Sequence, residues 1–441
     1  MAAGVIHMIE AECFPAGRNL SEQGGVSMTR AEHLGLSSQR LMAFDDRLNE
    51  RYVASGRLPG AVTLIHRRGE CAHVNVVGSM DVERAKPMRE DAIFRIYSMT
   101  KPITSVAFMT LVEQGLVALD DPVSSVIPEW KNLGVAVAGA RSLGGFQTRP
   151  VGREMLMVDL LRHTAGLSYF FQARTNVDAA YRELALGEPT NPGGLDGMID
   201  CLSQLPLDYS PGDEWNYSVA THVLGYLVEK ISGQPFADYL KHALFDPIGM
   251  PDTGFFVPDD KVDRFCACYR PSPSRGLILQ DDPATSQFRQ RPALASGGSG
   301  LVSTAGDYLR FCRMLLDRGS IDGRQILSPK TVELMTINHL PGGRMLDQMS
   351  RSTFSEAVYP GLGFGLGFAV TQDLASTMQP GSVGDYFWGG GASTAFWIDP
   401  VEDLIVVFMT QLLPSTTYKI RRDLRHWVYG AMCDGAGVSR A

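Results

Sequence analysis

The apolar and polar positions of the chain follow two different periods in different segments. Apolar residues recur at helical spacing from Ser38 to Ser55 and again after Ser98, where Gly115 is a stop signal. Residues 60–78 form two β-rich runs around a polar Arg67–Glu70 turn, which predicts a hairpin. Four further strand patterns occupy residues 363–373, 383–391, 392–400 and 404–411. A closing amphipathic helix is predicted over residues 415–432.

The middle of the chain has a different pattern. Residues from about 120 to 295 are rich in loops and helical periods with few strand signals, and residues 155–167 and 218–245 are the clearest helices. Strands from both ends of the chain can share one sheet only if this middle is an insertion. We therefore expect an α/β chain of the α+β type. Its predicted parts are an N-terminal extension (1–37), an α/β domain with a central antiparallel sheet (38–130 and 296–441) and a mostly helical domain (131–295).

Composition and charge narrow the functional classes. Of 441 residues, 44% are hydrophobic and 20% are charged, which is typical of a soluble globular protein. The net charge of -8, without Lys/Arg runs, argues against nucleic acid or an anionic membrane as a partner. No apolar run is long enough to span a membrane, and no basic segment followed by an apolar one marks a secretory signal. We expect a cytoplasmic protein; its oligomeric state stays open.

Neither metal nor cofactor is expected. The seven cysteines have no framework spacing, so reduced, buried thiols are the simplest interpretation. Cys266 and Cys268 form the only close pair, and one intervening residue does not match zinc-ligand spacing. The sequence also lacks an HExxH motif and an acidic calcium loop.

Ser98 and Lys101 are the first candidates for chemistry. Ser-x-x-Lys is weak by itself, and the alternative is a helix N-cap followed by a surface lysine. At the start of a buried helix, however, residues i and i+3 share a face, so the amine can reach the serine Oγ. Burial lowers the pKa of a lysine, and the helix N-terminus favours a developing oxyanion. No serine has glycine at both -2 and +2, so the nucleophile elbow of other hydrolases is absent, and nothing marks a Ser-His-Asp triad.

Three later stretches extend this pattern: LLRHTAGLSYF (160–170), YSPGDEWNYSVATHVLGYLVEKISG (209–233) and FDPIGMPDTGF (245–255). Together with the Ser-x-x-Lys motif, they closely resemble the serine β-lactamase and penicillin-binding-protein superfamily, on its class C side. Within that group the sequence resembles the family VIII carboxylesterases, over nearly all of residues 40–435. The resemblance implies a β-lactamase/DD-peptidase-like fold, in which helices flank an antiparallel sheet.

The resemblance also implies roles for individual residues. Ser98 would be the nucleophile, and Lys101 and Tyr217 would move its proton; the sequence leaves open which of the two is the base. The backbone N–H groups of Ser98 and Gly391 would form the oxyanion hole. For Tyr217 the alternative is an ordinary core aromatic with its hydroxyl satisfied elsewhere.

Two departures from the family pattern suggest the substrate. Val219 stands where class C enzymes have the Asn of Tyr-x-Asn, and Trp388-Gly389-Gly390 replaces Lys-Thr-Gly. Both changes remove polar partners of a β-lactam, so these substrate-binding positions suit a neutral ester. Trp388 has an alternative as strand-face packing, whereas consecutive glycines in a strand usually mark close approach by a backbone or ligand.

We therefore expect a serine carboxylesterase that hydrolyses neutral, short-chain esters through an acyl-enzyme, with weak β-lactam hydrolysis as a side activity. The alternatives are a class C-like β-lactamase or peptidase, an acyltransferase with the same residues, and a binding protein that has lost catalysis. Tyr169, Phe170 and Phe171 either line the pocket or belong to the core.

Overall fold

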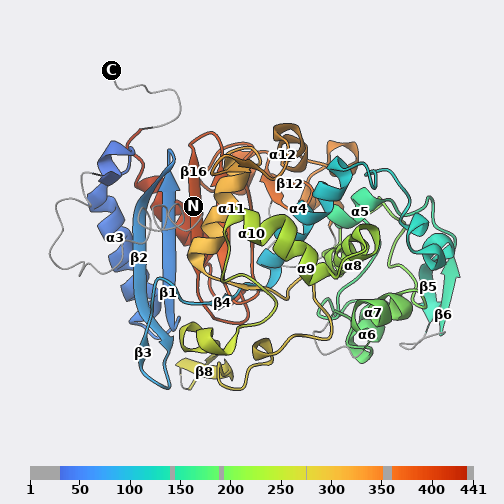
Figure 1. Cartoon of the computed structure of the whole chain (residues 1–441), viewed down its shortest axis with the longest axis horizontal. Helices are drawn as coiled ribbons and strands as arrows, with labels where there is room; N and C mark the ends of the chain where they lie inside the picture. Colours follow the sequence, from blue (N-terminus) through green and yellow to red (C-terminus); the bar gives the residue numbers. More distant parts are fainter. Residues whose placement is uncertain (1–29, 140–144, 188–192, 275, 351–359, 435–441) are drawn as a thin grey trace.

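An eight-stranded sheet joins the two ends of the chain in the computed structural model, which describes residues 30–139, 145–187, 193–274, 276–350 and 360–434. Its order is β12-β13-β14-β15-β16-β1-β2-β3, and every neighbouring pair is antiparallel (Figure 1). The strands are β1 Gly60–Arg67, β2 Glu70–Asp81, β3 Lys86–Pro87, β12 Leu362–Phe364, β13 Ala369–Thr371, β14 Tyr386–Gly389, β15 Ala395–Asp399 and β16 Leu404–Met409. The expected sheet from both ends of the chain is confirmed.

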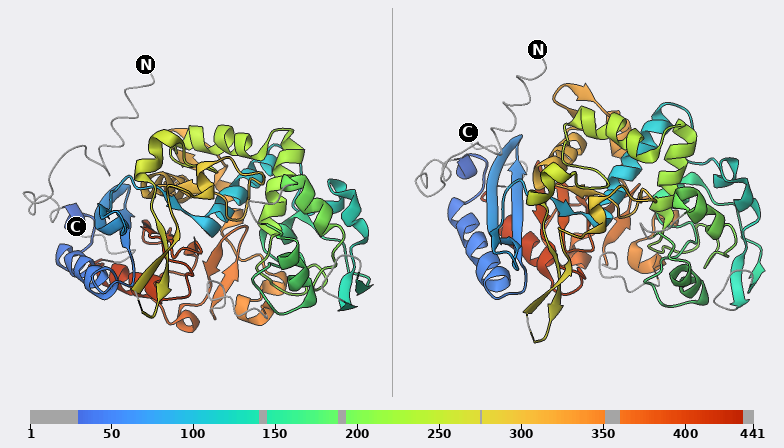
Figure 2. Two further views of the ribbon diagram at one scale, coloured as in Figure 1. Left: turned by 90° about the horizontal axis from the view of Figure 1, so that it is seen from below. Right: turned by 60° about the horizontal axis from the view of Figure 1, so that its bottom comes forward.

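Both faces of the sheet are covered, which explains why β1 is buried along its whole length. Successive residues of a strand point to opposite faces, and accordingly Ala61 and Ile65 pack in one buried cluster while Val62 and Leu64 pack in another. The first cluster includes α3 (Ser38–Leu48) and α15 (Ile420–Gly430), which lie together on the outer face (Figure 2). The second includes α4 (Thr100–Glu113) and α11 (Ala305–Leu316) on the inner face.

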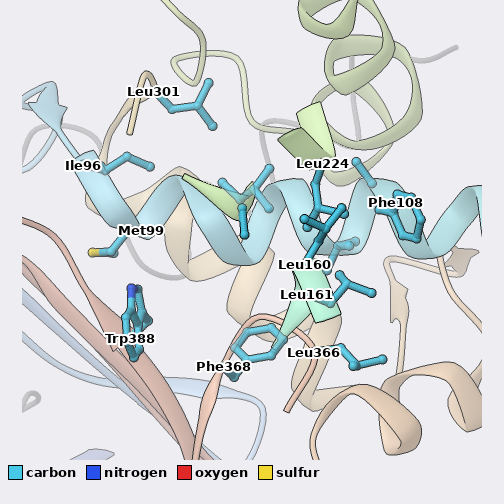
Figure 3. Close-up of a cluster of buried hydrophobic side chains, with 14 of the residues drawn as sticks. Ile96, Met99, Phe108, Leu160, Leu161, Leu224, Leu301, Leu366, Phe368 and Trp388 are labelled. Atoms are coloured by element: carbon cyan, nitrogen blue, oxygen red, sulfur yellow. The ribbon is translucent and has the colours of Figure 1, made fainter. Parts of the chain in front are cut away.

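Helix α4 is the centre of the second cluster. Its residues from Thr100 to Leu111 are all buried, and Gly115, with φ of 69°, follows its end. Figure 3 shows side chains of several elements gathered around it, among them Leu160, Leu224 and Phe368. A buried helix can hold catalytic groups rigidly at its first turn.

Mostly helical structure follows β4 (Phe94–Arg95) and α4 and makes up the other side of the molecule (Figure 1). Its helices are α5 Met157–Leu161, α6 Asn176–Glu183, α7 Gly194–Leu202, α8 Ala220–Ser232, α9 Phe236–Leu240 and α10 Asp246–Ile248. Shorter elements precede the returning strands: β9 Val302–Ser303, β10 Ser320–Ile321, β11 Arg324–Gln325, α12 Pro329–Met335, α13 Leu346–Met349 and, after β13, α14 Leu374–Thr377.

Two small hairpins lie in this middle part, where the sequence has few strand signals. They are β5–β6 (Val135–Gly139 and Phe146–Arg149) and β7–β8 (Cys268–Ser272 and Gly276–Asp281). The second hairpin is supported from outside, because the backbone of Tyr269 exchanges hydrogen bonds with Gln411 and Leu413. Such tertiary support overrides a weak local pattern.

The predicted N-terminal extension is described only from residue 30 onward; residues 1–29 lie outside the described part. Leu34 and Leu36 are buried, and the Ser37 amide donates to the carbonyl of Ala431 at 2.8 Å. Residues 30–37 therefore pack against the end of α15. The division into domains stays a prediction. In the described ranges no helix combines the length and apolar character needed to cross a bilayer.

Candidate active site

Ser98 lies in a 3₁₀ turn, Tyr97–Met99, immediately before α4. The N-cap of α4 is Met99, and no side chain caps the helix, so Ser98 is not the capping residue that the alternative interpretation supposed. Tyr97 has φ of 43°, a conformation that costs free energy for any residue other than glycine. This strained turn sets the position from which Ser98 Oγ faces its neighbours.

Lys101 holds its amine against that hydroxyl. Its Nζ donates to Ser98 Oγ at 3.2 Å and to the carbonyl oxygen of Gly298 at 2.6 Å. The side chain is 2% exposed, and Nζ lies 4.5 Å from the centroid of the Tyr217 ring. The structure thus brings together the three residues that the sequence analysis selected for catalysis, from the turn before α4, from α4 itself and from the loop before α8.

Tyr217 is enclosed by aromatic rings. Its ring centroid lies 5.0 Å from that of His163, 5.7 Å from that of Tyr169 and 5.5 Å from that of Trp388. These residues come from the 160–170 stretch and from β14. Because planar rings in contact on several sides leave little room for rotation, the phenol has a fixed orientation beside the amine of Lys101.

His163 and His222 stand beside this group, and sequence reasoning gave neither of them a role. Burial, and then the positive charge of Lys101, lowers the pKa of His222 to about 3 and that of His163 well below its ordinary value. Both imidazoles are therefore neutral near pH 7. Both histidines lie in stretches that carry the family resemblance, and that resemblance is the sequence signal that could have identified them.

Sequence reasoning also gave no role to the segment 296–300, SGGSG. Its Gly298 carbonyl accepts from Lys101, and a Cβ at that position would lie 2.2 Å from His222 Cε1. The neighbouring Gly297 carbonyl accepts from Thr104 Oγ1 at 2.7 Å. This loop therefore lines the inner side of the site, and its glycines are required by the close approach of helices α4 and α8.

The glycines after Trp388 lie against the turn that carries Ser98. A Cβ on Gly390 would lie 2.4 Å from the carbonyl oxygen of Ile96, and one on Gly391 would lie 3.9 Å from Tyr97 Cβ. In the described part of the chain, no group accepts a hydrogen bond from the backbone amide of Ser98 or of Gly391. An oxyanion hole requires two such donors, and the assignment of these two amides to one stays a prediction.

Trp388 and Val219, the two departures from the family pattern, are both buried. Figure 3 shows the indole of Trp388 pointing toward Met99, and no group in the described ranges accepts a hydrogen bond from its Nε1. Val219 is the N-cap residue before α8, and its Cγ1 lies 3.5 Å from where a Cβ on Gly187 would stand. Neither side chain carries a charge.

The three aromatics at residues 169–171 form one cluster above Tyr217. The rings of Tyr169 and Phe171 stack at 4.4 Å, and Phe170 meets Tyr169 edge-on at 5.4 Å. Phe171 is 39% exposed. Within the described ranges no three His, Cys, Asp or Glu side chains gather as a metal site.

Comparison with known proteins identifies the family. The Beta-lactamase family model matches residues 46–430. The chain belongs to the β-lactamase family. Protein Rv1367c of Mycobacterium tuberculosis is 38% identical over 82% of this chain and 88% of that protein. Esterase EstB of Burkholderia gladioli is 32% identical over 83% of this chain and 88% of that protein.

A solved structure agrees with these relatives. EstCE1, described as a hydrolase with promiscuous acyltransferase activity, superimposes with a TM-score of 0.74 at 28% identity, over 89% of this chain and 99% of that one. The resemblance to family VIII esterases of the β-lactamase and penicillin-binding-protein-like superfamily is thereby confirmed. The protein is a serine hydrolase, and its relatives support an esterase or acyltransferase on this scaffold.

Proposed function

We propose that the protein is a carboxylesterase that cleaves neutral, short-chain esters through an acyl-enzyme on Ser98. One observation carries the proposal: Lys101 Nζ lies 3.2 Å from Ser98 Oγ and 4.5 Å from the centre of the Tyr217 ring. A hydroxyl beside a buried amine and a phenol has what a nucleophile needs, namely a group that accepts its proton at the moment of attack.

The reaction takes two acyl-transfer steps. Ser98 Oγ attacks the carbonyl carbon and gives its proton to the Lys101–Tyr217 pair, while the amides of Ser98 and Gly391 bind the oxyanion. The bond to the alcohol oxygen then breaks, and the pair returns the proton to that oxygen. Water next gives a proton to the pair, attacks the acyl-enzyme and releases the carboxylic acid, and the proton goes back to Ser98 Oγ.

The preference for a neutral ester follows from the uncharged side chains of Trp388 and Val219. Trp388 and Val219 offer neither the cation nor the amide that would pair with an anionic β-lactam, and burying an unpaired carboxylate is costly. The test compares turnover of a short-chain p-nitrophenyl ester with that of a chromogenic cephalosporin. We expect the ester to be the much better substrate; faster opening of the cephalosporin would reverse the assignment to a class C-like β-lactamase or peptidase.

Acyl transfer to an alcohol is the second candidate. It is favoured by the description of EstCE1 as a hydrolase with promiscuous acyltransferase activity, because an acyl-enzyme accepts water or an alcohol with the same residues. Product analysis of ester turnover with and without an added alcohol separates the two. A new ester formed in preference to the acid would make the protein an acyltransferase.

Ser98→Ala tests the nucleophile directly. We expect this variant to keep the wild-type melting temperature and to lose both ester turnover and labelling by a fluorophosphonate. A wild-type protein that the fluorophosphonate does not label would favour a binding function over catalysis.

A further inference from the structure

The helix behind strand β14 holds the peptide that we assign to the oxyanion hole. We propose that Arg421 is a positioning residue, which orients and polarises the peptide unit between Gly390 and Gly391. This inference rests on the proposed function, since it concerns the second oxyanion donor. It does not require a particular acyl chain or acceptor.

Two contacts of Arg421 are to backbone carbonyls. Arg421 lies in the first turn of α15, and its Nη2 donates to the carbonyl oxygens of Gly390 at 2.7 Å and Thr394 at 2.8 Å. Thr394 O also accepts from the Gly390 amide at 3.0 Å. One guanidinium nitrogen therefore joins both sides of the turn that carries Gly391.

The geometry of the peptide bond relates this contact to the active site. The C=O of Gly390 and the N–H of Gly391 belong to one planar trans unit and point in opposite directions. With the carbonyl held toward α15, the N–H is directed away from that helix. Gly391 lies near the turn that carries the nucleophile, since a Cβ on it would stand 3.9 Å from the Cβ of Tyr97, the residue before Ser98.

The positive charge of Arg421 also polarises the peptide unit that the residue orients. A hydrogen bond from a guanidinium is stronger than one from a neutral donor, and hydrogen bonds along one peptide unit polarise each other. The cation on the Gly390 carbonyl thus makes the Gly391 N–H a better donor to an oxyanion. The whole stabilisation is in place before the substrate arrives, which is the condition for efficient electrostatic catalysis.

Two features show that the position is built for this side chain. A Cβ on Gly389 would lie 2.4 Å from the Arg421 Cζ, so glycine is needed there to admit the guanidinium. This is the close approach that the consecutive glycines indicated. In addition, a cation is electrostatically unfavourable in the first turn of a helix. The two carbonyls compensate Arg421 at that place.

The neighbouring arginine provides a matched control. Arg422 follows on the same turn, its side chain is 50% exposed, and its ion pair with Asp423 is long, at 3.9 Å. Arg421→Gln and Arg422→Gln remove the same charge from the same helix terminus, but only the first removes the bond to the Gly390 carbonyl. We expect Arg421→Gln to lower kcat for an ester by about tenfold or more with KM within about twofold of wild type. Arg422→Gln keeps both constants.

A second readout separates positioning from a general loss of structure. Sulfur is a poorer hydrogen-bond acceptor than oxygen, so a thionoester gains less from the oxyanion hole than the corresponding ester. The ratio of ester to thionoester turnover therefore falls in Arg421→Gln and is unchanged in Arg422→Gln. Arg421→Lys restores part of both kcat and the ratio, because its ammonium can reach one carbonyl.

The outcomes distinguish this inference from the proposed function. Wild-type kcat and a wild-type ester-to-thionoester ratio in Arg421→Gln would overturn the role of Arg421. A fall in kcat with an unchanged ratio would also overturn it, since the residue would then act through stability alone. If the wild-type enzyme neither hydrolyses esters nor reacts with a fluorophosphonate at Ser98, it is the proposed function that fails.

Discussion

The Nζ atom of Lys101 lies 2.6 Å from the carbonyl oxygen of Gly298, a residue 197 positions further along the chain. An ammonium has three N–H donors, and this bond together with the one to Ser98 Oγ directs two of them. The amine is consequently held beside the nucleophile in the resting protein. The loop that supplies the carbonyl is in turn pressed against His222.

The first prediction concerns that loop. Gly298→Ala places a methyl group where the His222 ring stands, at 2.2 Å from Cε1, so the loop and its carbonyl must move. Because a displacement of about 1 Å can cost two orders of magnitude in rate, we expect kcat to fall at least tenfold. The melting temperature should fall as well, as it does when a buried site is overpacked.

Steady-state kinetics and thermal unfolding of the variant measure both effects. Gly430→Ala is the control, because a Cβ there meets nothing within 4 Å. A Gly298→Ala enzyme with wild-type kcat would show that the Lys101–Gly298 contact is dispensable.

The second prediction treats Lys101 and Tyr217 as one proton-transfer unit. Lys101→Met and Tyr217→Phe each remove the polar group and keep most of the packing, and each should lower kcat by about 10²–10⁴. Since the groups act on the same proton, the double variant should be no slower than the worse single variant. Single-turnover acylation rates in a double-mutant cycle give the answer. Losses that multiply would mean that the two residues act in separate steps.

The third prediction concerns the indole of Trp388. Its Nε1 is buried and has no acceptor in the described ranges, which is unfavourable unless a substrate or water accepts the bond. If the substrate is the acceptor, Trp388→Phe should lower kcat/KM by about five- to thirtyfold, the equivalent of one hydrogen bond. Initial rates of ester hydrolysis over a range of ester concentrations give kcat/KM for the wild type and for the variant.

Trp397→Phe is the matched control for this change. Trp397 lies on β15, is likewise buried with Nε1 lacking an acceptor in the described ranges, and packs in the cluster on the other face of the sheet. Equal effects of the two variants on kcat/KM would attribute the loss to packing and would remove Trp388 from the substrate wall.

The contacts that the sequence predicts are those between residues close together in the chain. The β1–β2 hairpin and the approach of Lys101 to Ser98 follow from periods and one helical turn, so patterns within a few residues predict them. The family resemblance added Tyr217, which no local rule reaches. The contact of Lys101 with Gly298, and that of Arg421 with Gly390, join segments whose separation hides them from any pattern.

The last prediction uses the neutral state of His222. Its pKa is about 3 in the folded protein, lowered by burial and by the charge of Lys101, against an ordinary value of 6.5. Between these values the unfolded chain binds a proton that the folded protein does not, so the free energy of unfolding decreases as pH falls from 6.5 toward 3. From pH 7.5 to pH 5 this group costs roughly 2 kcal/mol of stability.

His222→Gln cannot take up that proton. Urea unfolding at pH 7.5 and pH 5 should therefore show a smaller loss of stability in this variant than in wild type, by roughly 2 kcal/mol. The comparison between the two proteins cancels the other groups that titrate in this interval. An equal loss in His222→Gln and wild type would mean that His222 is protonated in the folded state, and the ammonium of Lys101 would then have a second cation beside it.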